Sequence, residues 1–237
     1  MNPVRTQNRD TFVLSRCLQF FPEWDEDSLI CLCQFLKNLI TCTDMWFPMN
    51  EFSTTCVNYI ETEQLEIDLA NSLKDTTIDM RIMYIHWGTE YQLQHNAFQQ
   101  GVGQWLADLG IDLIIGGHPH VVQDHGVLTA ADGRQVPVVY ALGNLVSNQR
   151  WEDSNGGVMT TVDIDRETNK IVAIDFIPVY VHKGSLMNER RNYYCIPTED
   201  YLRGDLPFTL PNDSLEQDLR LFHSNTTKRL STSMKWE

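Results

Sequence analysis

Two histidines on either side of a proline follow a short apolar run that ends in two glycines. The run spans residues 113–117, and the triplet His118-Pro119-His120 comes directly after it. A short β-branched run is typical of a buried parallel strand. Proline favours an extended conformation for the residue before it, and residues i and i+2 of an extended chain point to the same side. We therefore expect both imidazoles to face one point beyond the strand, where they suit a metal ion or a phosphate. The alternative is a solvated loop that carries two histidines.

A β-α-β unit is predicted to position this triplet. Residues 80–85 read as a strand, and an amphipathic helix is predicted over 96–109. Gly110 follows that helix at the position where glycine commonly stops helices. The strand over 112–116 completes the unit. Because the strands of such units are parallel, their carboxyl ends are expected at the same edge of one sheet.

Further polar side chains follow the predicted strands at this edge. His86, Trp87 and Glu90 come after the strand over 80–85, and Asn144 comes after a third strand over 136–141. We expect the imidazole of His86 and the carboxylate of Glu90 to approach the two histidines of the triplet. The alternative for Glu90 is a solvated loop position.

The remaining pattern indicates an α/β layered domain with a central mixed sheet. A β-hairpin with strands 157–164 and 171–181 is predicted at an edge of that sheet, and residues 41–58 are expected to be irregular. Further helices are predicted over 28–40, 63–74 and 213–222. The apolar face of the helix over 96–109 is predicted to hold Phe98, Val102, Trp105, Leu106 and Leu109.

Charge and composition exclude several classes of function. The chain of 237 residues has a formal net charge of −14, which disfavours nucleic acid or an anionic membrane surface as a partner. It has no apolar stretch of about 20 residues, so no transmembrane segment is predicted. No signal peptide is recognisable at its start. Five of the six cysteines lie within residues 1–56, and their spacing predicts small core residues rather than a zinc site or a disulfide framework.

Three linked motifs carry a resemblance to a known family. They are His86-Trp87-Gly88-Thr89-Glu90-Tyr91, Gly116-Gly117-His118-Pro119-His120-Val121-Val122-Gln123 and Tyr140-Ala141-Leu142-Gly143-Asn144-Leu145. Their order and spacing resemble the C-terminal half of the CapA family, the capsule-synthesis domain linked to poly-γ-glutamate. That family is similar in fold to the calcineurin-like metallophosphoesterases. The resemblance extends over about residues 57–180.

The resemblance implies a site in which divalent metal ions, manganese, zinc or iron, clamp the oxygens of a phosphoryl group. It assigns His86, His118 and His120 as metal ligands or phosphate contacts. Glu90 would orient a histidine or act as a base. Three further residues would support these ligands or contact the substrate: Trp87, Gln123 and Asn144.

The chain also departs from the family pattern. The family's first half begins with a strand that ends in Gly-Asp and supplies an aspartate to the metal centre. The only Gly-Asp pair in this chain is Gly204-Asp205. We therefore predict a divergent or replaced segment over residues 1–56, a CapA-like domain over 57–181 and a polar extension over 182–237.

Three functions remain open at this stage. The first is a CapA-like protein that supports capsule or poly-γ-glutamate biosynthesis, with capsule-synthesis proteins or an anionic polymer as partners. The second is a soluble metal-dependent phosphoesterase, and the third is a fragment without an active metal centre. The family resemblance implies the cell envelope as the location, although no anchor is recognisable in this chain.

Overall fold

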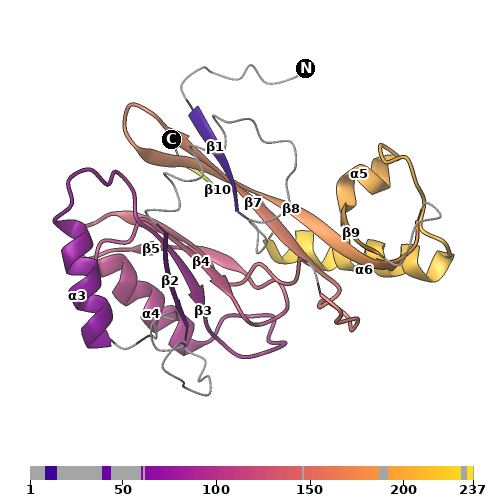
Figure 1. Ribbon diagram of the computed structural model, residues 1–237, viewed down its shortest axis with the longest axis horizontal. Coiled ribbons are helices and arrows are strands. Elements are labelled where there is room, and N and C mark those ends of the chain that lie inside the picture. The colour runs from indigo at the N-terminus through magenta and orange to yellow at the C-terminus, as the bar shows by residue number, and fades with distance from the viewer. Residues whose placement is uncertain are drawn as a thin grey trace. The chain divides into compact units, whose positions relative to one another are not determined.

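The computed structural model describes residues 9–14, 39–43, 60, 62–145, 147–186, 192–230 and 234–236. The chain divides into two compact units, each with its own sheet (Figure 1). The central unit is Gln19–Gly143, and the C-terminal unit joins Met1–Leu18 to Asn144–Glu237. The predicted α/β class is confirmed, with helices beside a sheet that mixes parallel and antiparallel strands. None of the helices in the described ranges has the length and apolar character needed to span a bilayer.

The sheet of the central unit has five strands in the order β2-β3-β4-β6-β5. The first four run parallel, and β5 pairs antiparallel with β6. The predicted β-α-β unit is therefore confirmed, and the carboxyl ends of β2, β3 and β4 lie at one edge. The strands are β2 (Leu39–Thr43), β3 (Ile82–His86), β4 (Leu113–Gly117), β5 (His125–Thr129) and β6 (Gln135–Val139).

Two helices pack against one face of this sheet, α3 (Thr62–Leu73) and α4 (Ala97–Asp108). The prediction that Phe98 lies on the buried face of α4 was wrong, because its side chain is exposed. Gln99 is buried instead, in line with Gly103 and Leu106 at helical spacing. Gln99 also takes part in the capping box with Asn96 at the start of α4.

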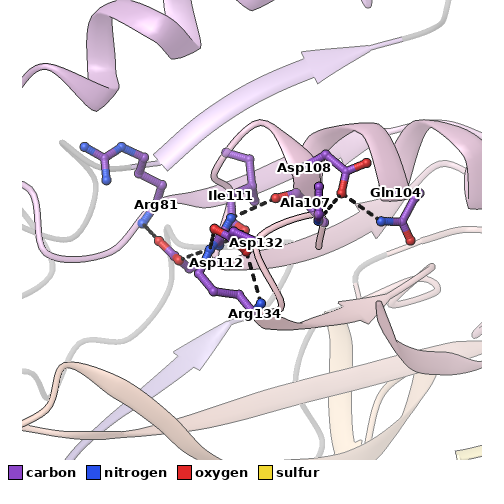
Figure 2. Close-up of polar contacts among 9 residues, drawn as sticks. Arg81, Gln104, Ala107, Asp108, Ile111, Asp112, Asp132 and Arg134 are labelled. Atoms are coloured by element: carbon purple, nitrogen blue, oxygen red, sulfur yellow. Dashed lines mark hydrogen bonds and ion pairs between the residues drawn. The ribbon is translucent and has the colours of Figure 1, made fainter. Parts of the chain in front are cut away.

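A polar network holds the opposite edge of the sheet, where β3 and β4 begin (Figure 2). The Arg134 guanidinium donates to the main-chain carbonyl of Ala107, in the last turn of α4, at 2.9 Å and to that of Ile111, just after the helix, at 3.0 Å. It also pairs with Asp112 at 3.1 Å, whose carboxylate accepts from the Arg81 amide. The network therefore adds a charged donor to carbonyls at and just after the end of α4, and joins that helix to both strands.

The C-terminal unit contains a second sheet in the order β1-β7-β8-β10, with β9 also paired to β8. The predicted hairpin is confirmed as β7 and β8, and alternate residues Val158, Thr160 and Val162 point inward. Its predicted place at an edge of the central sheet was wrong. The 15-residue β8 is long enough to pair with three strands, so the hairpin lies inside a sheet of its own. The strands are β1 (Arg9–Leu14), β7 (Gly156–Asp165), β8 (Lys170–Gly184), β9 (Asn192–Pro197) and β10 (Met234–Lys235).

Two helices complete this unit, α5 (Thr198–Arg203) and α6 (Asp213–Leu230). The helix predicted over 213–222 continues to residue 230, because Thr226 and Leu230 extend the buried stripe begun by Leu219 and Phe222. The sequence did not predict this continuation, because Asn225, Thr226 and Thr227 have low helix propensity.

Part of the predicted N-terminal helix is also wrong. Leu39 and Ile40 belong to β2, as do three residues of the segment predicted to be irregular, because pairing with β3 overrides local preference. The rest of that helix, residues 44–59, and the side chains of the five N-terminal cysteines lie outside the described residues.

His182 in β8 makes the stability of the C-terminal unit dependent on pH. Its side chain is buried, and its Nε2 has no hydrogen-bond partner within the described part of the chain. Burial, followed by the charge of Arg150, lowers the pKa of this imidazole from 6.5. The folded protein therefore takes up this proton less readily than the unfolded chain does, so the free energy of unfolding falls as the pH drops below about 6.5.

Urea denaturation of wild type and His182→Gln, at about pH 7.5 and about pH 5.5, checks this expectation. The variant is expected to lose less stability between the two pH values than the wild type. An equal loss in both proteins would show that the charge of His182 is not the cause.

Candidate metal site

Three side chains that follow β3 and β4 bring their ligand atoms together. One carboxylate oxygen of Glu90 and one ring nitrogen each of His118 and His120 all lie within 4.8 Å of one another. Ligands of a first-row metal bond at about 2.0–2.2 Å and therefore stand about 3–4 Å apart around it. A small contraction would suffice to bind an ion, and two imidazoles with one carboxylate suit zinc, manganese or iron. The chemistry and placement of these three residues fit a divalent metal.

His86 stands beside this group without being one of its three members. It is the last residue of β3 and pairs in register with Gly117 at the end of β4. Its ring centroid lies 4.6 Å from that of His118. The predicted approach of the two strand-end histidines is thus confirmed, while the role of His86 as a metal ligand remains a prediction.

The backbone of the His-Pro-His triplet differs from the predicted extended form. His118 has a φ of 100° and His120 a φ of 59°, in the region that L-residues seldom occupy. Tyr91, on the facing loop, has a φ of 62°. The prediction of an extended His118 was wrong, and the two imidazoles converge because the backbone turns at both residues. Such strained conformations persist where surrounding contacts hold them, and they concentrate at functional sites.

Contacts between the two loops hold this strained arrangement. The Tyr91 amide donates to the carbonyl oxygen of Pro119 at 2.8 Å. The ring of Tyr91 stacks against that of His120, with centroids 6.0 Å apart. Each loop therefore fixes the other, and Glu90 is the residue directly before this junction.

The site is open to water. The Nε2 atom of His120 lies 3.9 Å from the Glu90 carboxylate, and the two side chains are 22% and 48% exposed. A water-exposed pair at this separation contributes little stability. The pair is therefore not an important source of stability for the fold.

Trp87 supports the site from within the core. Its side chain is fully buried, and its indole N–H donates to the main-chain carbonyl of Tyr140 at 2.8 Å. Its own amide donates to the carbonyl of Gly117. These two bonds link the ends of β3, β4 and β6. The Trp87 indole and the Tyr140 carbonyl lie so close to Gly116 that no side chain would fit at that position.

Gln123 ends a chain of buried amides that fixes the loop after Glu90. Its Nε2 donates to the carbonyls of Gln92 and Gln94 at 2.9 and 3.1 Å. Its Oε1 accepts from Gln99 Nε2 at 2.8 Å, and Gln99 Oε1 in turn accepts from the Asn96 amide that caps α4. The position of the Glu90 loop is thus tied to the start of the helix. The predicted contact of Gln123 with a ligand or substrate remains a prediction.

Sequence reasoning did not identify a second polar cluster next to this loop. His95 Nδ1 lies 2.8 Å from the Asp124 carboxylate, and the His95 ring stacks on Tyr140 at 3.9 Å. Burial, and then the charge of Asp124, raise the pKa of the Tyr140 hydroxyl. These residues are far apart in the chain, and no short motif marks their contact.

Asn144 lies in the C-terminal unit. It is almost completely buried, and its Nδ2 donates to the carbonyl of Ser154 at 2.9 Å and to Gln149 Oε1 at 3.0 Å. These bonds fix the loop between β6 and β7. Its predicted contact with a metal or substrate remains a prediction.

Comparison with known proteins agrees with the motifs that build the site. Residues 43–149 match the model of a family described as bacterial capsule synthesis protein PGA_cap. The chain is 27% identical over 171 residues to the capsule biosynthesis protein CapA of Bacillus anthracis, which covers 70% of this chain and 39% of that protein. It is 26% identical over 107 residues to the PGA biosynthesis protein CapA of Bacillus subtilis strain 168, covering 45% of this chain and 26% of that protein. The chain thus spans well under two thirds of either relative, and its residues 43–149 are similar to the PGA_cap family of bacterial capsule synthesis proteins.

Proposed function

We propose that this protein binds a divalent metal ion through Glu90, His118 and His120 and uses that site in the biosynthesis of a capsule polymer. The observation that carries the proposal is the convergence of three ligand atoms within 4.8 Å. The similarity to two CapA proteins supports the capsule pathway as the setting. Poly-γ-glutamate, or the proteins that assemble it, is the proposed partner.

The residues of the site divide the chemistry between them. A bound metal would supply Lewis acidity toward an oxygen of the substrate. His118 and His120 would hold the ion, and Glu90 would complete its charge balance or take a proton from an attacking water. His86, whose ring lies beside that of His118, would act as a further ligand or as a donor to an anionic oxygen.

A simple phosphoesterase is the second candidate, favoured by the same two-histidine, one-carboxylate set. It would release nitrophenol from p-nitrophenyl phosphate or its diester in a metal-dependent way. A protein that acts only in capsule assembly would leave these esters intact while still binding metal. A chain that neither binds metal nor hydrolyses esters would be a segment without an active centre.

Metal content tests the proposal directly. The purified protein, reconstituted with zinc, manganese or iron, is expected to retain about one equivalent of metal by elemental mass spectrometry. The double variant His118→Ala/His120→Ala is expected to retain less than about a tenth as much, because one carboxylate alone binds weakly. His223→Ala, in α6 of the other unit, is the control for loss of a histidine.

Absence of metal from folded wild-type protein would contradict the proposal. The similarity to the PGA_cap family would then concern ancestry and fold alone, and the catalytic hypothesis would be withdrawn. Equal retention by wild type and the double variant would place the metal elsewhere.

A further inference from the structure

The C-terminal unit carries an exposed pair of cations around one aromatic ring. The Tyr193 ring is on β9, and its side chain is 42% exposed. The guanidinium carbon of Arg150 lies 5.9 Å from the ring centroid, and the ammonium nitrogen of Lys183 lies 5.7 Å from it. Both distances are within the range of cation–π attraction. Two like charges are therefore gathered at one place on the surface.

Hydrogen bonds fix the position of this cluster. Lys183 and Tyr193 are direct partners in the β8–β9 pairing, so their side chains share a face of the sheet. The Oδ1 atom of Asn148 accepts from both the Lys183 ammonium and the Tyr193 hydroxyl. These bonds connect the loop that carries Arg150 to the two strands. Because the positions of the charges are set before a ligand arrives, less ordering entropy is lost on binding.

The charges of the cluster are not neutralised by carboxylates of the described residues. Arg220 and Arg229 of the same unit both form ion pairs, whereas neither Arg150 nor Lys183 forms one with any carboxylate that the structure describes. The charge of Arg150 also contributes to lowering the pKa of His182. In a chain with a net charge of −14, two positive charges therefore stand together at one exposed place.

We propose that Arg150 and Lys183, held around Tyr193, bind a ligand that carries more than one oxyanion group. A guanidinium binds a carboxylate or phosphate through two parallel hydrogen bonds, and an ammonium adds a compact charge. Lys183 keeps donors beyond its single bond to Asn148. Trp151, largely exposed and next to Arg150, adds an apolar surface along which a chain-like ligand can lie. This binding requires no metal and is independent of Glu90, His118 and His120.

Fluorescence anisotropy with short labelled probes tests the site in protein that has been stripped of metal with EDTA and then desalted, because EDTA is itself a polycarboxylate. The carboxylate probe is a pentaglutamate peptide, and unlabelled tripolyphosphate, added as a competitor, is the phosphate probe. Pentaglutamine, which has the same length without charge on its side chains, is the control peptide. Binding of pentaglutamate is expected at about 20 mM salt and is expected to weaken at about 150 mM, because exposed charges are screened.

The double variant Arg150→Gln/Lys183→Gln is expected to bind pentaglutamate at least about tenfold more weakly than wild type, since two charged contacts are lost. Lys170→Gln/Lys228→Gln removes the same charge from two other exposed positions of this unit and is expected to change affinity less than about threefold. Competition by tripolyphosphate would identify phosphate as a ligand of the same site, and lack of competition would restrict the site to carboxylates.

Three results would overturn the proposal. They are absence of binding to wild type at low salt, equal binding of pentaglutamine, and equal weakening by the two double variants. Retained metal in a protein that fails these tests would leave the proposed metal function intact, so the two ideas can fail separately.

Discussion

Replacement of Gly116 by alanine is expected to lower the free energy of unfolding of the central unit by about 3 kcal/mol or more. A methyl group at this position would lie 1.9 Å from the carbonyl oxygen of Tyr140 and 2.4 Å from the indole nitrogen of Trp87. Main chain cannot move aside as a flexible side chain can. The substitution must therefore break the Trp87–Tyr140 hydrogen bond and push β4 away from the end of β6.

Gly101→Ala is the matched control for this prediction. Gly101 lies inside α4, and a methyl group there would have no neighbour within 4 Å. Alanine is favoured over glycine in a helix, so this variant is expected to gain up to about 1 kcal/mol. Urea denaturation followed by circular dichroism measures both changes. Similar stability of Gly116→Ala and wild type would mean that the strand end is not packed as described.

Replacement of Gln123 by alanine is expected to cost about 2–4 kcal/mol of stability. The substitution removes the donor to the Gln92 and Gln94 carbonyls and the acceptor for Gln99, and it leaves a cavity in the core. Buried polar groups without partners lose their hydration without compensation. Gln104→Ala, which removes an amide bonded near the surface of α4, is expected to cost less than about 1 kcal/mol.

The variant Gln123→Ala also tests whether the buried amides affect metal binding in addition to stability. Because Gln123 holds the loop that follows Glu90, Gln123→Ala is expected to weaken metal binding about 10-fold or more even where the protein remains folded. Isothermal titration at a temperature well below unfolding measures this effect. Metal affinity equal to that of Gln104→Ala would show that the loop keeps its position without Gln123.

Local pattern was sufficient to predict the elements that build the candidate site. The apolar runs before His86 and His118 identified two parallel strands, and the helix between them set their common direction. Parallel pairing alone then placed the histidines at one edge of the sheet. The β7–β8 hairpin was equally predictable, because alternation and a polar turn are short-range signals.

The features that sequence did not predict depend on contacts between distant segments. The backbone of His118 departs from the preference set by Pro119 because the facing loop bonds to that proline's carbonyl. Leu39 and Ile40 become strand because β3 offers an edge for pairing. Gln99 is buried although it is polar, since its amide partner Gln123 lies 24 positions later in the chain. In each case tertiary contact outweighs local propensity.

The pairing of β1 with β7 has a consequence for the order of folding. Arg9 is aligned with Asp165, and the whole central unit is inserted between these two strands. During synthesis, β1 leaves the ribosome before β7, and its partner becomes available only after the central unit has emerged. The central unit, built from nearer neighbours, can form during that interval. After a proteolytic cut at Gly143, only the hydrogen bonds and packing of the β1–β7 pair would hold β1 in its sheet, and loss of β1 would leave the edge of β7 open to pairing with other molecules.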